Sequence, residues 1–267
     1  MLKINKYSLI KNVAFLGVAT LSLSLIATSS SFSDGHIYGE NNPVTVKGYK
    51  GSKTDSTAYT GQIARQLQHN SLKKIVSKGN PNDPSSNTLN KMMNYFENKD
   101  KAKTMAILDP KSSSKFPVKQ KIVGEISTGS NLAGKADERP QLSWPNNMSG
   151  ADVIRFMIKK ASKISGGVDM RNGMNYPQLI SKYTMGAVLY HQACDNYLDE
   201  KMTASNKPND KPYKKGAPYT GKEHSWDEAF GYWGAAAHTM TLSAKQSYDV
   251  AKKKDFKAAD FLSLIHI

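Results

Sequence analysis

The amino-acid sequence predicts an all-α protein, a bundle of helices joined by long irregular loops. Apolar residues recur at helical spacing in several segments of the chain. No alternation of short strands with helices is present, which argues against a parallel sheet. The 267 residues, of which 39% are hydrophobic, supply enough apolar surface for one substantial core. The single cysteine excludes a disulfide scaffold, a zinc ribbon and an iron–sulfur protein.

The first 29 residues have the pattern of a Sec-type signal peptide. Lys3, Lys6 and Lys11 precede an apolar stretch over residues 13–27, and small residues follow it. The stretch is too short and too rich in Ser and Thr for a good transmembrane span, so an uncleaved N-terminal anchor is the lesser alternative. No cysteine follows it, which argues against a lipid anchor. We therefore expect a periplasmic or secreted protein with no transmembrane segment in the mature chain.

The rest of the chain divides into three parts. Residues 30–56 are rich in Ser, Gly, Asn and Lys and are predicted to be an extended lead-in. Residues 57–261 form the predicted helical domain. Residues 262–267 read LSLIHI, which is what a common sequencing-library adapter encodes in this frame. We therefore expect that the natural protein continues past Phe261 and that the helical domain is incomplete at its C-terminus.

We predict a helix wherever apolar residues at helical spacing are bounded by a capping residue at the start and by a helix-stopping residue at the end. Ser149 and Asp152 form a capping pattern before the amphipathic segment that ends near Ile164, and Pro177 suits the first turn of the longest predicted helix. Residues 109–147 are predicted to be an irregular insertion with a short β-like run at 121–126. Residues 205–221 are predicted to be a polar loop. The predicted helices span residues 57–77, a segment from about 86 to 96, 149–164, 177–201, 226–237 and 241–253.

The net charge of +15 does not by itself indicate a nucleic-acid partner. Only four of the 37 basic residues are arginines, and the lysines are spread over separate segments. Nucleic-acid binding needs basic side chains concentrated on one face, and lysine lacks the guanidinium fork that grips phosphate bidentately. We expect no nucleic-acid partner.

Residues 222–234 hold one dense group of side chains that could bind a metal or take part in catalysis. No P-loop, dinucleotide-binding, zinc-protease or serine-hydrolase motif is present in the sequence. On a helix, His224 shares a face with Asp227 and Glu228, while Trp226, Phe230 and Trp233 lie on another face. His191 and Asp195 repeat the four-residue spacing on the longest predicted helix. An imidazole and a carboxylate one turn apart can both bind a metal ion, or the carboxylate can orient the imidazole.

A structural interpretation of the same residues is the alternative. Acidic residues and serine at the start of a helix provide ordinary capping, and the aromatic residues would then lie in the core. His191 and Asp195 would form a pair on the helix surface. Two ligands are too few for a metal site, so further ligands must come from elsewhere in the bundle.

Three segments resemble an exported bacterial family, domain of unknown function 4856. Residues 59–65 (YTGQIAR) resemble its "SGQTAR" helix start, and residues 224–234 resemble its "HHWDEAFGYFG" signature. Between them, residues 178–198 resemble its "K-G-A-L-Y-x-Q…YL" helix through Lys182, Gly186, Ala187, Tyr190, Gln192, Tyr197 and Leu198.

That family is similar in architecture to the imelysin-like helical proteins. The resemblance implies an imelysin-like helical bundle in the periplasm or at the outer membrane, often under iron regulation. It also implies a GxHxxE metal motif, to which His224 with Asp227 or Glu228 corresponds. The glycine of that motif is absent here, since Lys222 stands two residues before His224.

Three functions follow from these observations. The first is a cell-envelope binding protein linked to the uptake of iron or another divalent metal, with His224, Asp227 and Glu228 as ligands and His191 and Asp195 as further ligands. Envelope or uptake proteins would be its partners. The second is a metal-dependent peptidase in which Glu228 is the general base acting on a metal-bound water. The third is a structural or interaction module without a metal site.

Overall fold

The structure is a computed structural model that describes residues 44–53, 56, 58–83, 86–99, 103–109, 120–233 and 245. The predicted signal peptide, most of the N-terminal half of the predicted lead-in, and the tail at 262–267 lie outside these residues. The predicted helix over 241–253 also lies outside them, apart from Lys245.

The described residues confirm the all-α prediction. The α-helices are α2 (Thr60–Val76), α3 (Asn87–Glu97), α4 (Gly150–Ser162), α5 (Tyr176–Thr184) and α6 (Gly221–Trp233). Helix α5 continues without a break into two stretches of wider, π-helical turns, η5 (Met185–Tyr190) and η6 (Gln192–Lys201). Four single 3-10 turns lie in the loops: η1 (Val123–Glu125), η2 (Ala133–Lys135), η3 (Pro145–Asn147) and η4 (Ser165–Gly167). The strands β1 (Val168–Asp169) and β2 (Met174–Asn175) form a small antiparallel hairpin, in which Val168 pairs with Asn175.

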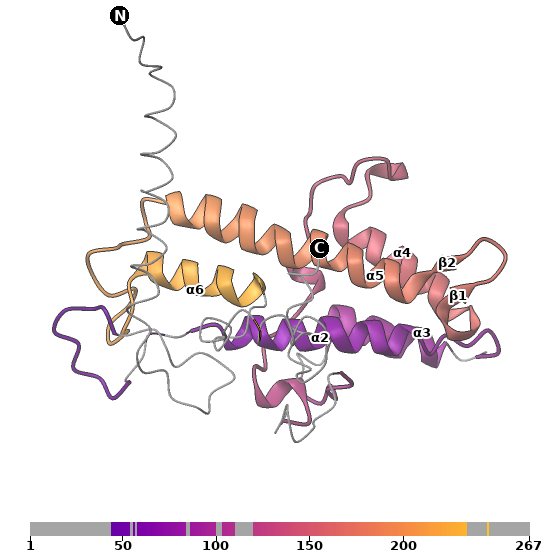
Figure 1. Cartoon of the computed structure of the whole chain (residues 1–267), viewed down its shortest axis with the longest axis horizontal. Coiled ribbons are helices and arrows are strands. Elements are labelled where there is room, and N and C mark those ends of the chain that lie inside the picture. Colours follow the sequence, from indigo (N-terminus) through magenta and orange to yellow (C-terminus); the bar gives the residue numbers. More distant parts are fainter. Residues whose placement is uncertain are drawn as a thin grey trace, which may run out of the picture.

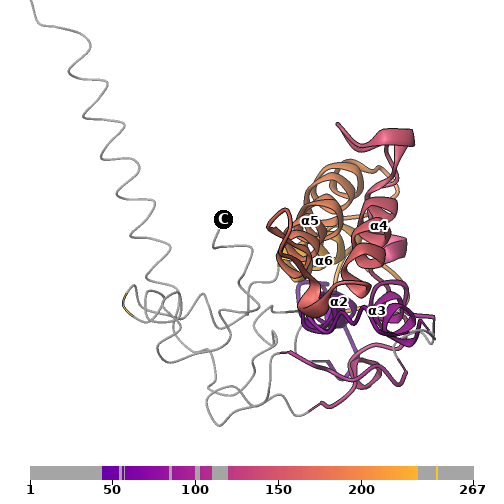
Figure 2. The same cartoon turned by 90° about the vertical axis from the view of Figure 1, so that its right-hand side faces the viewer.

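The rod made of α5, η5 and η6 runs along the length of the described fold (Figure 1). At one end α2, α3, α4 and α5 surround a common core, each packing on its two neighbours, as the end-on view shows (Figure 2). At the other end α6 returns beside η6 and also packs on α2. Helix α6 is thus held between the rod and α2.

Apolar side chains from all of these helices meet in one continuous core. Burial of this surface is the main force that holds the bundle together. The largest fully buried side chains include Leu67, Leu72, Met92, Phe96, Ile154, Ile158, Ile180, Met185, Leu189 and Tyr232. A smaller cluster of Ala64, Met105 and Val123 lies where the irregular insertion covers α2.

Two helices begin where the sequence predicts. The Ser149 hydroxyl accepts a hydrogen bond from the backbone amide of Asp152, and the Asp152 carboxylate accepts one from the amide of Ser149, which completes a capping box. The Asn175 side chain accepts a hydrogen bond from the amide of Gln178, and Pro177 lies in the first turn of α5. Polar caps therefore fix the starts of α4 and of the rod.

The described part of the irregular insertion, residues 109 and 120–147, is built of turns rather than strands. Residues 121–126, predicted to be β-like, contain one isolated bridge from Ile122 to Ala106 and then the turn η1. The polar loop between η6 and α6 likewise contains one bridge, from Pro212 to Thr220. In the part of the chain that the structure describes, no helix combines the length and the apolar content that crossing a bilayer requires.

Candidate functional site

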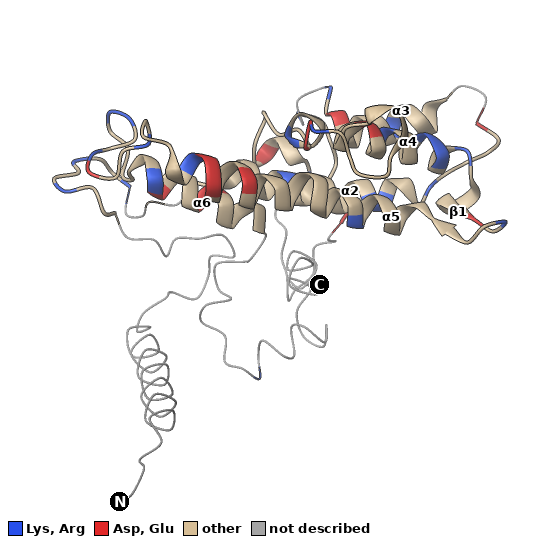
Figure 3. Ribbon diagram, turned by 90° about the horizontal axis from the view of Figure 1, so that it is seen from above, with Lys and Arg blue, Asp and Glu red and all other residues tan. Residues whose placement is uncertain are grey.

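Helix α6 starts earlier than the sequence periodicity predicts, because a capping box precedes it. The Thr220 hydroxyl accepts a hydrogen bond from the amide of Glu223 at 3.2 Å, and the Glu223 carboxylate accepts one from the amide of Thr220 at 2.7 Å. Apolar spacing alone places the start at Trp226. The Thr-x-x-Glu pattern is the signal that identifies the true start. Glu223, His224, Asp227 and Glu228 consequently all lie in the helix, and the red segments of α6 in Figure 3 mark its acidic residues.

The orientation of α6 differs from that expected of a helix that only caps and packs. Trp226 is 58% exposed and Trp233 is 42% exposed, whereas Asp227 is 5% exposed. The side chains of His224 and Glu228 are also largely buried. Burying polar groups is costly unless they find partners, so the contacts of these three residues define the site.

His224 packs against two tyrosine rings, which also stack on each other. Its ring centroid is 4.8 Å from that of Tyr213 and 4.9 Å from that of Tyr219. Its Nε2 atom is 3.5 Å from a carboxylate oxygen of Glu228. Burial lowers the pKa of His224, Glu228 acts in the opposite direction, and Lys207 and Lys214 lower the pKa further. The imidazole is therefore neutral at pH 7, which is the form that binds metals.

Glu228 is the centre of a group of polar residues drawn from three helices. Its carboxylate accepts a hydrogen bond of 2.9 Å from the Gln62 side chain on α2. Burial and the negative charge of Glu228 raise the pKa of Tyr197 on η6. Burial lowers the pKa of Lys201 on the same helix, and Glu228 partly opposes that shift. The charge of Glu228 thus acts on Tyr197 and Lys201 as well as on His224.

Tyr232 closes this group on the side of the core. Its side chain is fully buried, its ring centroid is 5.7 Å from that of Tyr197, and the Arg65 guanidinium lies 5.6 Å from its ring centroid. Among the described residues, neither the Tyr232 hydroxyl nor His224 Nδ1 has a hydrogen-bond partner. Unsatisfied buried polar atoms are uncommon in folded proteins, and here two of them flank Glu228.

Asp227 has a different role from its neighbours. Its carboxylate accepts a hydrogen bond from the backbone amide of Ala58, just before α2. Ala58 directly precedes Tyr59, the N-cap residue of α2. Asp227 therefore ties α6 to the segment that leads into α2, from a distant part of the chain.

The second predicted pair lies on the rod and forms its own network. His191 Nδ1 is 3.0 Å from the Asp195 carboxylate, which also accepts a 2.6 Å hydrogen bond from Arg139. Arg139 in turn binds Asp137. The hydrogen bond with His191 and the pairing with Arg139 lower the pKa of Asp195, against a smaller opposing effect of burial. The predicted surface pairing of His191 with Asp195 is present, with an arginine added.

The five predicted ligands therefore fall into separate arrangements. His224 and Glu228 lie together, Asp227 points to α2, and His191 and Asp195 join Arg139. Across the ranges that the structure covers, no group of three or more His, Cys, Asp or Glu side chains is placed to hold a metal ion. The metal site stays a prediction that needs donors besides the pair on α6.

The segments that resemble known motifs meet at Glu228. Gln62 and Arg65 come from residues 59–65, Tyr197 from the rod, and Glu228 and Tyr232 from α6. Gln66, one residue beyond the first segment, donates a 2.7 Å hydrogen bond to the Tyr232 carbonyl near the end of α6. Local spacing could not identify the α2 partners of α6, because Gln62 lies 166 residues before Glu228 in the sequence.

A close approach of two helices completes this meeting point. A methyl group at Gly231 would lie 2.7 Å from the Cβ atoms of both Tyr59 and Gln62. The Tyr59 ring also packs edge-on against Phe230, with 5.8 Å between ring centroids. Only glycine leaves room for α6 to approach α2 this closely, which is why Gln62 can reach Glu228.

Comparison with known proteins finds one family. The family model described as "Domain of unknown function (DUF4856)" matches residues 38–262. No curated protein and no solved structure matches the chain.

Proposed function

We propose that this chain, which belongs to the DUF4856 family, is an exported binding protein of the cell envelope. Helix α6 is its binding element. Export rests on the predicted signal peptide, and the location is periplasmic or secreted. The polar residues of α6 are turned inward while two tryptophans face solvent. A helix selected only for packing would bury the tryptophans and expose the carboxylates.

The single observation that carries this proposal is the buried pair of His224 and Glu228, with 3.5 Å between Nε2 and the carboxylate. The imidazole is kept neutral by burial, and its Nδ1 is without a hydrogen-bond partner among the described residues. A neutral imidazole beside a carboxylate is a common beginning of a metal site. We therefore propose iron or another divalent metal as the ligand, linked to its uptake.

The lysines around His224 and Glu228 mean that a metal bound there would need further ligands. Lys201, Lys207 and Lys214 lie close enough to influence the pKa of His224, and their positive charges oppose a bound cation. At least one further anionic or neutral donor must therefore join His224 and Glu228. The rod pair His191–Asp195 would contribute only after its contact with Arg139 is released.

A metal-dependent peptidase is the weaker proposal. It would require three protein ligands, an open coordination position and Glu228 free to accept a proton from a metal-bound water. Glu228 accepts a hydrogen bond from Gln62 and faces His224. This arrangement suits a ligand or a structural acceptor better than a general base.

A thermal-shift titration tests the binding proposal. The metal-free full chain is titrated with Fe(II), Zn(II) and Mn(II), beside Glu228→Gln and the exposed-site control Glu138→Gln. A ligand that binds only the folded state raises the unfolding temperature in a concentration-dependent way. We expect a rise in the parent and the Glu138 variant and none in the Glu228 variant. An equal response of all three proteins, or none in any, would overturn the metal proposal.

A further inference from the structure

The end of the bundle that lies away from α6 is built from segments that are distant in the sequence. The ends of α2 and α4 lie side by side there, because the Gly166 amide donates a hydrogen bond of 3.3 Å to the Gly79 carbonyl. The hairpin of β1 and β2 and the start of α5 lie at the same end (Figure 1). The described residues of 73–91 and 157–182 therefore form one end of the bundle, which we call the basic end.

The basic end has a large excess of positive charge. The two segments that build it contain nine Lys or Arg and two Asp, whereas residues 199–233, which carry α6 and the end of the rod, contain six Lys and six acidic residues. Figure 3 shows blue segments around the end that carries β1. The lysines exposed at the basic end include Lys74, Lys78, Lys159, Lys160, Lys163 and Lys182. None of these six forms an ion pair within the part of the chain that the structure describes.

The tip of the hairpin is held in shape by Asp169. Its carboxylate accepts hydrogen bonds from the Arg171 amide at 3.1 Å and from the Arg171 guanidinium at 3.0 Å, and its carbonyl accepts one of 2.8 Å from the Gly173 amide. Gly173 has a φ of +71°, a conformation that glycine adopts without strain. The ion pair with Asp169 occupies Arg171, the one arginine of these two segments, so the open positive charge of the basic end belongs to lysines.

The hairpin also carries exposed apolar side chains. Met170 lies at its tip and is 87% exposed, and Met174 on β2 is 46% exposed. Leu179 in α5 is 40% exposed, and α5 packs on both strands. Hairpin tips in water are usually built from Gly, Asn, Asp and Ser, so a methionine that projects from a tip is unusual. The basic end thus combines exposed apolar surface with an excess of positive charge, and such surfaces mark interaction sites.

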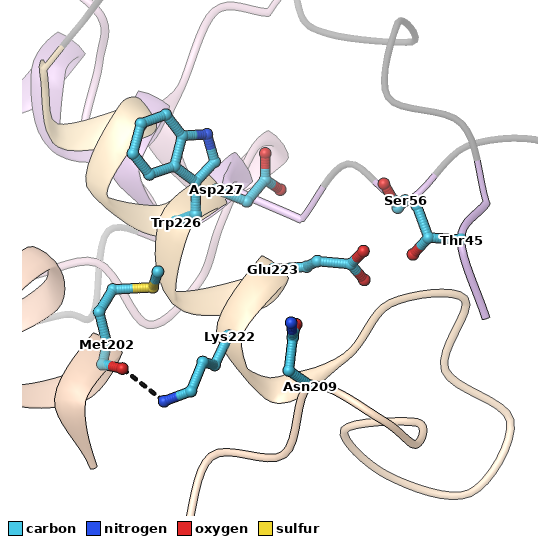
Figure 4. Close-up of a pocket in the computed structure, with 8 residues that line it drawn as sticks. All are labelled: Thr45, Ser56, Met202, Asn209, Lys222, Glu223, Trp226 and Asp227. Atoms are coloured by element: carbon cyan, nitrogen blue, oxygen red, sulfur yellow. Dashed lines mark hydrogen bonds between the residues drawn. The ribbon is translucent and has the colours of Figure 1, made fainter.

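The end that carries α6 does not combine these two features. Trp226 is 58% exposed there and lies at a cavity of about 370 Å³. The charged side chains of the cavity lining are Glu223, Asp227 and Lys222, and Figure 4 shows all three on the same helix as the indole. This end therefore presents charges of both signs around its exposed apolar surface, in contrast to the basic end.

We propose that the basic end docks the protein on the surface of a bilayer that contains anionic phospholipid. The Met170 thioether and the neighbouring apolar side chains enter the headgroup region, and the lysines around them contact lipid phosphates. Burial of apolar surface and the attraction between lysines and anionic lipid together hold a protein at a membrane interface. The long lysine stems allow the ammonium groups to reach the headgroups while the hairpin is buried.

The exposed methionines favour a bilayer over an acidic macromolecule. An acidic protein or a nucleic acid would account for the lysines but would leave the apolar tip in water. Lysine also lacks the guanidinium fork that recognises individual phosphates, and Arg171 is occupied by Asp169. The proposal goes beyond the binding function of α6 and does not depend on it, since it uses none of the residues of that site.

Vesicle flotation tests the proposal on the exported protein. The predicted signal peptide is removed, since its apolar stretch would itself enter a bilayer. Binding is compared between vesicles of phosphatidylcholine alone and vesicles of phosphatidylcholine mixed equally with phosphatidylglycerol. We expect binding to the anionic vesicles to be at least about tenfold tighter than binding to the neutral ones, because each lysine near an anionic surface adds to the attraction.

A substitution at the tip of the hairpin tests the apolar contribution. Met170→Ser removes the apolar side chain, and Leu142→Ser, at a position that is 94% exposed in the loop before η3, is the matched control. We expect Met170→Ser to weaken binding to the anionic vesicles at least about threefold and Leu142→Ser to leave it unchanged. If Met170→Ser binds vesicles as the parent does and the parent binds polyglutamate tightly, the bilayer proposal is overturned and the basic end is a site for an acidic macromolecule.

A pair of lysine substitutions tests the contribution of charge. The double variant Lys78→Gln with Lys163→Gln removes two exposed charges from the basic end, and Lys211→Gln with Lys215→Gln removes two exposed charges from the polar loop before α6. We expect the first pair to weaken binding at least about fivefold and the second to leave it unchanged. No binding of the parent to anionic vesicles, or an equal loss in both pairs, would overturn the proposal. Metal binding at His224 and Glu228 is measured without lipid, so a failure here does not bear on it.

Discussion

The Asp227 carboxylate accepts a hydrogen bond from the backbone amide of Ala58, so a side chain of α6 holds the residue that precedes the N-cap of α2. The aspartate comes from a position 169 residues further along the chain. The contact links the segment that leads into α2 to the docking of α6.

Replacing Asp227 should therefore destabilise the whole bundle. We expect Asp227→Asn to lower the free energy of unfolding by about 1 kcal/mol and Asp227→Ala by about 2 kcal/mol, because asparagine keeps an acceptor and loses the charge. Urea unfolding measures both values. Asp210→Asn, at an exposed loop position, is the control and should be neutral. A neutral Asp227→Ala would show that the hydrogen bond with Ala58 is unimportant.

Gly231 should tolerate no larger side chain. A methyl group there would lie 2.7 Å from the Cβ atoms of Tyr59 and Gln62, so α6 would have to move away from α2. We expect Gly231→Ala to cost about 1–3 kcal/mol of unfolding free energy. Gly186 is the matched control, because it is exposed on the rod with nothing within 4 Å of an added Cβ. Gly186→Ala should be stabilising by about 0.5–1 kcal/mol, and similar effects of the two substitutions would contradict the close approach.

Gln62 and Glu228 should be energetically coupled. Their hydrogen bond of 2.9 Å joins α2 to α6 in a largely buried position. A double-mutant cycle with Gln62→Leu and Glu228→Leu should give a coupling free energy of about 1 kcal/mol. The same cycle between Gln62→Leu and Asp195→Asn should be additive, since the two residues share no contact. Additivity in both cycles would mean that the hydrogen bond does not hold the helices together.

His69 should make the stability of the bundle depend on pH. The ring is completely buried on α2, with Nε2 2.9 Å from the Ser181 carbonyl, and burial lowers its pKa from 6.5 to about 4. Between these values the unfolded chain binds a proton that the folded protein does not, so stability falls as the pH drops from 6.5 to 4. This group alone contributes a loss of about 3 kcal/mol over that interval.

Urea unfolding of the parent and of His69→Gln at several pH values checks this dependence. Glutamine can still donate to the Ser181 carbonyl and does not titrate, so the variant should show a flatter dependence on pH between 6.5 and 4. An unchanged dependence would mean that another group causes the acid destabilisation.

Most helices could be predicted from the sequence because their signals are local. The Ser149–Asp152 capping box and the apolar stripe that follows it define α4, which the structure places at Gly150–Ser162. The predicted helix over 177–201 corresponds to the rod of α5, η5 and η6. Its π-helical turns were not predicted, because the apolar residues of this segment also fit α-helical spacing. The early start of α6 was readable from Thr220 and Glu223, although apolar spacing alone does not reveal it.

The candidate site was predictable only in part, because spacing identifies which residues share a helix face but not which face is buried. Transfer free energies favour burial of Trp226 over burial of Asp227. The structure buries Asp227 because the amide of Ala58 is available as its partner, and it holds Glu228 inside because Gln62 is available. These partners lie in a different segment, so only the fold brings them together. The family resemblance identified the segments without showing that they touch.

The metal content of the full-length gene product, measured by mass spectrometry after purification without chelator, tests the proposed binding function most directly. It is compared with His224→Ala and with His191→Ala, whose imidazole is held in the Arg139 network. We expect stoichiometric iron or another divalent metal in the parent, little change in His191→Ala and no metal in His224→Ala. Absence of metal from the parent, or an equal amount in all three proteins, would contradict the account and leave His224 and Glu228 as structural contacts of α6.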